Sequence, residues 1–445
     1  PTPFMKPGTV IELAVEKPAA GGRMIARQDG LVVLVHAAIP GERVRAVVER
    51  TGQGVVYASA IDVLEPSPDR RAGAPDWACG GNVYSHIAYP RQLTLKGEVI
   101  ADALARIARL PAGSPIPVTG SPEDGYRMRA RFHARGRTLG FFREGTHGLC
   151  DPATTRQLLP GTCELVAALA GHLRDGSLDG VTEIELAENV PASERALDLE
   201  LGVPRAPRGL PSVAALPTVT GVSASFAAPS PDRRGRIRRT MTAGGEPSVV
   251  DTLELPGEGG PPAHFGLRHH AQAFFQGNRY LLAQLASRVV SLVPDGPVVD
   301  LYAGVGLFSA SLAASGCASV VAVEGDPWAA ADLKANAAPF GASLEPVEMA
   351  VEAYLAAHPV ARGATIVIDP PRTGLSKEAS AAVAAQPAGR LVYVSCDVAT
   401  FARDARKLTD AGYRLEHLEA FDLFPNTAHV EAVGVFERIS PCMPR

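Results

Sequence analysis

The last third of the chain alternates apolar β-rich segments with helical patterns, and this alternation restricts the fold more than any other feature. Strand-like segments lie at about 297–302, 319–323, 365–368 and 390–395, and helical patterns lie at 278–293, 307–314, 327–338 and 398–408. Two further β-rich stretches, at about 413–421 and 430–438, follow them. Because strands linked through helices run parallel, the pattern predicts a doubly wound, mostly parallel sheet that ends in an antiparallel hairpin.

One of these strand-like segments runs into a cysteine. Residues 391–395 predict a buried strand, Cys396 ends it, and Asp397 is well placed as the N-cap of the next helix. Open α/β sheets bind ligands at this edge, and the first turn of a helix favours a thiolate over a thiol. A free cysteine is more often a packed core residue, so Cys396 needs support from its neighbours before it indicates catalysis.

The length and the cysteine usage limit the class of protein. With 445 residues, two or three domains are expected. No apolar run is long enough to cross a membrane, and the N-terminus lacks the layout of a secretory signal. Six cysteines occur at scattered positions without C-x-x-C spacing. This argues against a disulfide framework and a zinc module, and it is typical of a protein of the reducing cytoplasm.

The chain divides into three parts by pattern. Residues 1–66 contain about five short strand-like runs separated by glycine-containing turns, which predicts a small closed barrel of OB type. Residues 67–265 predict a middle α+β domain, with a helix at about 91–109 that could pack on the third part. Its Pro- and Gly-rich stretch from Arg205 to Pro262 suggests irregular connections or a mobile insertion. Residues 266–445 form the Rossmann-like part.

Charge adds a hint about partners. A net charge of −4 does not indicate a nucleic-acid binder, but arginines cluster at 127–137 and at 233–239. Such clusters can contact phosphates on an otherwise neutral protein, although an ordinary solvated face explains each cluster equally well.

A glycine turn follows the first strand of the Rossmann-like part. In the segment Asp300–Gly306, Gly304 and Gly306 let the backbone approach a ligand closely. Glu324 ends the next strand, where a ribose-binding acid is expected. Ser309 replaces the third glycine of the dinucleotide fingerprint. An adenosyl ligand without a pyrophosphate therefore fits better than a nicotinamide or flavin cofactor, and S-adenosylmethionine is the candidate.

A second polar turn, Asp369-Pro370-Pro371-Arg372, comes directly after another strand. Two prolines would hold Asp369 rigidly at the edge of the sheet, although Pro-Pro usually marks only the end of a strand. Amino-group methyltransferases carry a similar Asp-Pro-Pro followed by an aromatic residue that stacks on a flipped base. Arg372 is not aromatic, which argues against that class.

Five motifs in order resemble one family. They are Phe274-Phe275-Gln276-Gly277-Asn278, the Asp300–Gly306 loop, Asp369–Arg372, Val394-Ser395-Cys396-Asp397, and Phe424-Pro425-Asn426-Thr427-Ala428-His429-Val430-Glu431. Together they resemble the RNA uracil-5 methyltransferases, which act on 23S ribosomal RNA and on tRNA. Residues 21–27 and 38–44 also resemble the TRAM domain of RNA-modifying enzymes. The resemblance thus covers nearly the whole chain and favours the TRAM-containing ribosomal RNA branch.

The resemblance implies a mechanism and a set of residues. Cys396 would add to carbon 6 of uracil, so that carbon 5 can take a methyl group from S-adenosylmethionine, and Glu431 would then remove the hydrogen at carbon 5. The residues that would hold the cofactor are Gln276, Tyr302, Gly304, Gly306, Glu324 and Asp369. The target base must leave its stack to reach the thiol, so base flipping or capture of a loop nucleotide is expected.

Three features depart from the family. Relatives with a TRAM domain often hold a four-iron four-sulfur cluster on four cysteines near a C-G-G-C string. Here the string reads Cys79-Gly80-Gly81-Asn82, and Cys150 and Cys163 only approach the missing fourth position in sequence. Because each iron needs its own thiolate, we expect no iron–sulfur cluster and no other metal. Leu307 replaces an Asn beside the cofactor, and the charge of Asp397 is expected to raise the pKa of the cysteine.

Four functions remain open on this basis. The first is formation of 5-methyluridine in 23S ribosomal RNA, and the second is the same reaction on tRNA. The third is a catalytically weak or inactive relative that binds RNA, against which the presence of both Cys396 and Glu431 argues. The fourth is a small-molecule or amino-group methyltransferase. We expect a cytoplasmic monomer that has RNA as its partner and does not associate with membranes.

Overall fold

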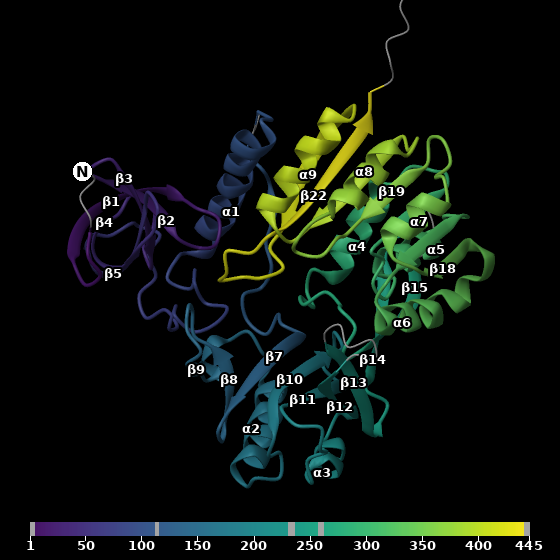
Figure 1. Cartoon of the computed structure of the whole chain (residues 1–445), viewed down its shortest axis with the longest axis horizontal. Coiled ribbons are helices and arrows are strands. Elements are labelled where there is room, and N and C mark those ends of the chain that lie inside the picture. The colour runs from purple at the N-terminus through teal and green to yellow at the C-terminus, as the bar shows by residue number, and fades with distance from the viewer. Residues whose placement is uncertain (1–4, 112–114, 230–235, 257–261, 440–445) are drawn as a thin grey trace, which may run out of the picture.

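The strands of the chain occupy three lobes in the view of Figure 1. The computed structural model describes residues 5–111, 115–229, 236–256 and 262–439. In chain order, the lobes hold a closed barrel, a seven-stranded sheet and an eight-stranded sheet, and a two-stranded hairpin packs beside the last. No helix within these residues is both long and apolar enough to span a membrane.

The N-terminal lobe is the small barrel that the sequence predicted. Its strands are β1 (Val10–Pro18), β2 (Met24–Gln28), β3 (Leu31–His36), β4 (Arg43–Thr51) and β5 (Val55–Glu65), and they close in the order β1-β2-β3-β5-β4. Alternate side chains of these strands, among them Val33, Val44 and Val56, fill the interior. The period of two in the sequence therefore produces the closed barrel.

A long helix follows the barrel and contacts two lobes. Helix α1 (Tyr89–Ala103) continues into a π-helical turn, η1 (Leu104–Ala108). Leu95 packs in the barrel core, whereas Ile100 and Leu104 belong to a core of the eight-stranded sheet. Next, the short strand β6 (Val118–Thr119) pairs with the edge of that sheet. The segment 89–119 therefore ties the barrel to the C-terminal lobe.

The middle lobe is a sheet of order β13-β12-β11-β10-β7-β8-β9. Its elements are β7 (Arg129–Arg135), β8 (Thr138–Phe142), β9 (Leu149–Cys150), a 3₁₀ turn (Pro152–Thr155), α2 (Pro160–Arg174), β10 (Val181–Glu188), β11 (Arg195–Leu201), α3 (Leu210–Ala214), β12 (Val219–Pro229) and β13 (Arg236–Gly245). Leucines of β11 and α2 fill the core between the sheet and its helices. The arrangement is α+β, as the sequence predicted.

The expectation of an irregular or mobile stretch between Arg205 and Pro262 was wrong for most of its length. Strands β12, β13 and β14 (Ser248–Leu255) occupy it, while residues 230–235 and 257–261 lie outside the described part. In β12, the alternating Ser223 and Ser225 hydroxyls both donate to the buried carboxylate of Asp198 on the neighbouring strand. Small and polar residues thus form a strand here because their hydrogen-bond partner lies on a neighbouring strand. Local composition does not reveal such a partner.

The eight-stranded sheet confirms the doubly wound prediction, with order β18-β17-β16-β19-β20-β22-β21-β6. Its elements are α4 (Leu282–Ser291), β16 (Val298–Leu301), α5 (Leu307–Ala314), β17 (Val320–Glu324), α6 (Pro327–Ala337), a 3₁₀ turn (Ala338–Ser343), β18 (Leu344–Glu348), α7 (Val351–Ala357), β19 (Thr365–Ile368), α8 (Lys377–Ala385), β20 (Arg390–Ser395), α9 (Val398–Asp410), β21 (Tyr413–Phe421) and β22 (Glu431–Arg438). Strands β16 to β20 are parallel, and β22 runs antiparallel between β20 and β21.

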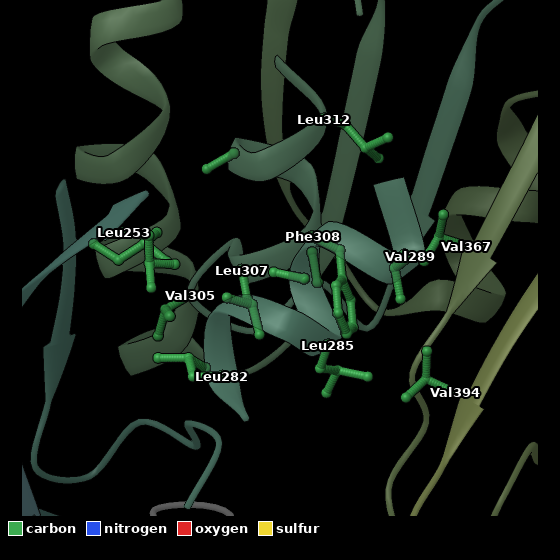
Figure 2. Packing of buried hydrophobic residues seen from close by; sticks show 14 of the residues in the cluster. Leu253, Leu282, Leu285, Val289, Val305, Leu307, Phe308, Leu312, Val367 and Val394 are labelled. Carbon is green, nitrogen blue, oxygen red and sulfur yellow. The ribbon is translucent and has the colours of Figure 1, made fainter. Parts of the chain in front are cut away.

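Both faces of this sheet are buried. Val298 faces one hydrophobic core and Val299 the other, which explains why the central strands read as continuous apolar runs. The hairpin of β14 and β15 (Ala263–His270) covers part of the first core. Figure 2 shows Leu253 of this hairpin near Val305 and Leu282, and all three belong to the same cluster.

The cysteines depart from the expectation of unpaired thiols. Cys79, which lies between the barrel and α1, forms a disulfide with Cys150 at the end of β9, across 71 residues of sequence. The two Cα atoms lie 5.8 Å apart because an antiparallel bridge between Cys79 and Arg143 brings the two segments together. Sequence spacing could not predict this pair, because the approach of the segments is purely tertiary.

We expect Phe401→Ala to lower the free energy of unfolding by ~3–5 kcal/mol, because it empties the contact between α9 and the sheet. Phe401 is buried against the rings of Tyr393 and Phe436. Urea unfolding followed by circular dichroism measures the loss. As a control, Arg406→Ala on the outer face of α9 should change stability by about 0.5 kcal/mol or less; equal losses in both variants would contradict the assigned packing.

Candidate functional site

The side chains that the sequence singled out gather along one edge of the eight-stranded sheet. Tyr302, Glu324, Asp369 and Cys396 stand at or directly after the carboxyl ends of β16, β17, β19 and β20. These strands are parallel and in register, so their ends meet at the same edge. Glu431 begins the antiparallel strand β22, and Ser395 pairs with Ala432, so Glu431 arrives beside Cys396 from the opposite direction.

Cys396 is a thiol in a partly buried, mainly acidic setting. Burial raises its pKa to about 12, and the nearby carboxylates of Glu431 and Asp369 add to the increase. The guanidinium of Arg372 opposes them. The sequence had pointed to Asp397 as the acid that raises this pKa, but the Asp397 carboxylate accepts a 2.8 Å hydrogen bond from Thr400 N and caps α9. The predicted N-cap is therefore confirmed.

Glu431 is a buried carboxyl group that faces the same space. Its side chain is almost fully buried, and burial raises its pKa well above the ordinary value, with a further increase from Asp369 and a decrease from Arg372. A carboxyl group with a raised pKa holds its proton more tightly than a surface glutamate, so it can serve as a proton acceptor near neutral pH. The two residues that the mechanism requires are thus electrostatic neighbours.

Three acids line the sheet edge next to Cys396. Burial raises the pKa of Asp300 to about 7 and that of Asp369 to about 8, and Glu324 contributes to both increases. Glu324 itself accepts hydrogen bonds from Gly304 N at 2.8 Å and Asp326 N at 2.6 Å. The hydroxyl and the main-chain N–H of Ser309 lie beside the Asp300 carboxylate and lower its pKa in part, without offsetting the effect of burial. A cluster of acids of this kind, two of them buried, favours a ligand with positive charge and hydrogen-bond donors.

The turn between β16 and α5 uses backbone angles that glycine adopts readily and that other residues adopt rarely. Gly304 and Gly306 have φ angles of +57° and +97°, and Tyr302, which is not a glycine, has +60°. A residue other than glycine costs free energy when its backbone adopts this left-handed conformation. The presence of Tyr302 in it, beside the cluster of acids, suggests a functional constraint. Leu307, which follows this turn, is buried in the hydrophobic core.

The segment around Gln276 reaches the site from the start of the C-terminal lobe. Gln276 is buried, and its neighbour Asn278 donates a 3.1 Å hydrogen bond to Leu423 O in the loop that leads to Glu431. Gly277 O accepts from Met128 N of the middle lobe. The segment therefore lies where this loop and the middle lobe meet. Within the described part of the chain, the side chain of Gln276 makes no hydrogen bond or ion pair with Asp300, Glu324 or Asp369.

Two residues of the site were missed as candidates. Asp300 was treated only as part of the glycine turn, and Arg372 only as a residue that is not aromatic. A buried acid at the end of the first strand and an arginine after Pro-Pro are both visible in the sequence. Their electrostatic contact with Asp369, Cys396 and Glu431 is not visible, because it depends on how neighbouring strands are ordered.

The residues near Cys79 do not fit an iron–sulfur cluster. Cys79 is bonded to Cys150, and its neighbours in the string are Gly80, Gly81 and the buried Asn82. Gln157 lies against Gly81 and donates a hydrogen bond to Gly80 O. The described residues contain no group of three or more histidine, cysteine or acidic side chains arranged to hold a metal.

We expect alkylation of Cys396 by iodoacetamide to be slow at neutral pH and to accelerate as the pH rises. Replacing Glu431 with Gln should speed the reaction at alkaline pH, where Glu431 is ionised, because it removes a negative charge that raises the pKa of the thiol. Peptide mass mapping separates Cys396 from Cys163 and Cys317, which are also free. Arg372→Met should slow the reaction, and equal rates in all three proteins would contradict the proposed electrostatics.

Asp300 should make the ligand-free protein less stable as the pH rises. Its pKa is raised on folding, so the unfolded chain releases the proton near pH 4 while the folded protein retains it up to about pH 7. The free energy of unfolding should therefore fall between these values. In Asp300→Asn this part of the fall should disappear, and melting temperatures from pH 4.5 to 8 measure it. Parallel profiles for both proteins would contradict the assignment.

Comparison with known proteins agrees with this geometry. A family model described as tRNA (Uracil-5-)-methyltransferase matches residues 360–439, which include Asp369, Cys396 and Glu431. The 23S rRNA (uracil(1939)-C(5))-methyltransferase RlmD of Alkalilimnicola ehrlichii is 32% identical over 97% of this chain and 97% of its own length. The protein of the same name from Pseudomonas putida is 31% identical over 98% of this chain and 95% of its own length.

A solved structure shares the fold. It is the tRNA (uracil-54, C5)-methyltransferase of Pyrococcus abyssi in complex with S-adenosyl-L-homocysteine, with a TM-score of 0.71 and 23% identity, and the match covers 96% of this chain and all of that one. This chain therefore has the same overall fold as that protein. Given relatives above 30% identity along nearly the full length, this chain belongs to the RNA uracil-C5 methyltransferase family.

Proposed function

We propose that this protein transfers a methyl group from S-adenosylmethionine to carbon 5 of a uridine in 23S ribosomal RNA, through a covalent bond between Cys396 and carbon 6 of the base. The observation that carries the proposal is the meeting of Cys396, Glu431, Asp369 and Arg372 at one edge of the sheet. A thiol and a proton acceptor on the two sides of a flipped pyrimidine are the groups that this reaction needs.

The first step is addition of sulfur to the ring. Carbon 5 of uracil is a poor nucleophile, and attack of the Cys396 thiolate on carbon 6 moves the electrons of the C5=C6 bond towards oxygen 4. The resting thiol has a raised pKa, so the thiolate must be stabilised when RNA is bound. Arg372 is the positive charge next to the sulfur, and it is suited to hold both the thiolate and the enolate that replaces it.

The last step is elimination. After carbon 5 has accepted the methyl group, its hydrogen leaves as a proton to the carboxylate of Glu431. The electron pair of that bond restores the C5=C6 double bond, and the C6–S bond breaks with its electrons on Sγ of Cys396. The raised pKa of Glu431 makes it a stronger base than a surface glutamate, which favours removal of a proton from carbon.

The cluster of Asp300, Glu324 and Asp369 fits S-adenosylmethionine, which supplies an electrophilic methyl group when bound. The buried carboxylate of Asp300 suits the positive charge of its methionine part, and Glu324 lies where a ribose hydroxyl could donate to it. Tyr302, Gly304 and Gly306 would form the turn along the adenosyl group. Gln276 and Asp369 complete the proposed set, and either could also touch the uracil.

Ribosomal RNA is favoured over tRNA as the substrate because the relatives named for 23S rRNA are 32% and 31% identical over nearly the full length, whereas the solved tRNA enzyme is 23% identical. The names of the family model and of the solved structure refer to tRNA, so tRNA is the second candidate. In either case the partner is RNA, and we propose that a monomer in the cytoplasm acts on it. A relative that only binds RNA would not need the pairing of Cys396 with Glu431.

RNA that contains 5-fluorouridine tests the proposal. Because fluorine cannot leave as a cation, elimination fails, and we expect an adduct of protein and RNA that survives denaturing electrophoresis when S-adenosylmethionine is present. Cys396→Ala should give no adduct. Glu431→Gln should accumulate an adduct even on unmodified RNA, while the wild-type protein turns over.

A matched set of RNAs identifies the substrate. Fragments of 23S rRNA and whole tRNA, each methylated in vitro and mapped for 5-methyluridine by mass spectrometry, should show product in the ribosomal RNA. Product in tRNA alone would support the second candidate. Absence of any adduct with fluorinated RNA of both kinds would overturn the covalent mechanism.

A further inference from the structure

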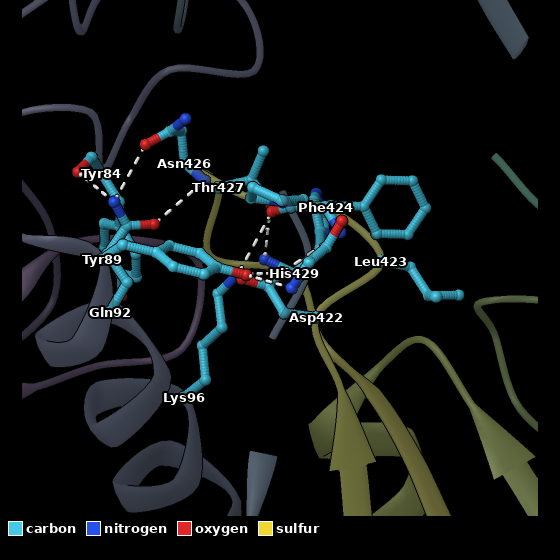
Figure 3. A network of polar contacts seen from close by, with 12 residues as sticks. Tyr84, Tyr89, Gln92, Lys96, Asp422, Leu423, Phe424, Asn426, Thr427 and His429 are labelled. Carbon is cyan, nitrogen blue, oxygen red and sulfur yellow. Dashed lines mark hydrogen bonds and ion pairs between the residues drawn. The ribbon is translucent and has the colours of Figure 1, made fainter. Parts of the chain in front are cut away.

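The loop that carries Glu431 into the site is held by a helix from the far end of the chain. This loop, residues 422–430, joins β21 to β22, and Glu431 follows it directly. Figure 3 shows α1 lying against the loop, with Gln92 and Lys96 directed towards it. More than 320 residues of sequence separate the two segments.

The first contact is a buried ion pair. Lys96 Nζ donates to Asp422 Oδ1 and, at 3.1 Å, to Phe424 O, and the two charged side chains are 1% and 0% exposed. Asp422 also accepts from Phe424 N, so the pair fixes the first turn of the loop. Loss of one partner would leave a buried charge uncompensated, which costs far more than loss of a surface pair.

The second contact is a reciprocal pair of hydrogen bonds. Gln92 Nε2 donates to Asn426 Oδ1 at 2.9 Å, and Gln92 Oε1 accepts from Asn426 N at 3.0 Å. Asn426 O in turn accepts from Tyr84 N at 2.8 Å. Asn426 has a φ angle of +64°, so the loop is kept in an unfavourable conformation by partners outside it.

The barrel adds to this support. Ala428 of the loop packs against the barrel core, to which Leu95 of α1 also belongs. A Cβ atom at Gly22 of the barrel would lie only 3.3 Å from Ala428. The barrel, α1 and the loop therefore form one continuous packed unit that ends at Glu431.

We propose that Gln92 and Lys96 are positioning residues for the base Glu431, so that removal of the proton from carbon 5 depends on α1. This inference rests on the proposed function. The pairing of β21 with β22 sets Glu431 opposite Phe421, whereas α1 sets the path of the loop between these two ends. A displacement of the Glu431 carboxylate by up to about 1 Å slows proton transfer. It leaves Cys396, which follows a different strand, able to add to the ring.

The test separates formation of the adduct from its release. In Gln92→Met we expect adduct formation on unmodified RNA at near the wild-type rate, and release slowed roughly tenfold or more, so that adduct accumulates as in Glu431→Gln. Gln386→Met is the matched control. Gln386 is also a buried amide that bonds to main-chain groups, Val360 N at 2.9 Å and Leu355 O at 3.3 Å, but it lies away from the loop.

The ion pair gives a second, independent readout. Lys96→Met should slow release, and Lys96→Met combined with Asp422→Asn should restore much of it, because no buried charge is left unpaired and the asparagine oxygen can still accept from Phe424 N. This rescue keeps the test valid even if Lys96→Met alone folds poorly. A purely structural role of Lys96 would instead lower the rate of adduct formation and the rate of its release together.

The outcomes distinguish this inference from the proposed function. Equal ratios of release to formation in Gln92→Met, Gln386→Met and the wild type would overturn the positioning role. So would a double variant that is no better than Lys96→Met. If the wild-type protein forms no adduct with fluorinated RNA, or Glu431→Gln turns over normally, the proposed function fails first.

Discussion

The structure depends on keeping several ionisable groups buried at one edge of a parallel sheet. Asp300, Asp369 and Glu431 are held among apolar strands, and burial is the largest cause of the raised pKa of each. In water these groups would ionise and repel one another. Inside the protein the fixed strand order keeps them close, and the unfavourable electrostatics are retained because a ligand or a reacting base can relieve them.

Cys396 shows how this setting shapes chemistry. A helix N-terminus alone would favour a thiolate, yet burial and two neighbouring carboxylates raise the pKa of the thiol to about 12. In the ligand-free protein Cys396, the proposed nucleophile, is therefore held in its protonated form. Arg372 is the opposing charge, so the balance between Arg372 and the two acids decides when the sulfur becomes reactive.

The three lobes contribute unequally to this site. The eight-stranded sheet supplies the reactive groups, while the barrel and α1 hold the loop that leads to Glu431. The middle lobe reaches the site through Met128, which bonds to the segment of Gln276. Packed contacts and hydrogen bonds therefore connect the barrel and the middle lobe to the edge of the sheet where Cys396 and Glu431 lie.

Periodicity in the sequence determined the barrel and the alternating strands and helices of the C-terminal lobe. Few other folds are compatible with a period of two, or with short apolar runs between helical patterns. Strands β19 and β20 begin and end as predicted. Position at strand ends also identified Glu324, Asp369 and Cys396. The stretch after Arg205 was misjudged, since the serines of β12 form a strand only with Asp198 beside them.

Only the tertiary structure decided which of these residues meet. The disulfide of Cys79 with Cys150 and the ion pair of Lys96 with Asp422 both join segments that are far apart in the chain. The physical reason is that local pattern fixes where a side chain points relative to its own strand or helix. Desolvation and pairing depend on what other segments place around it.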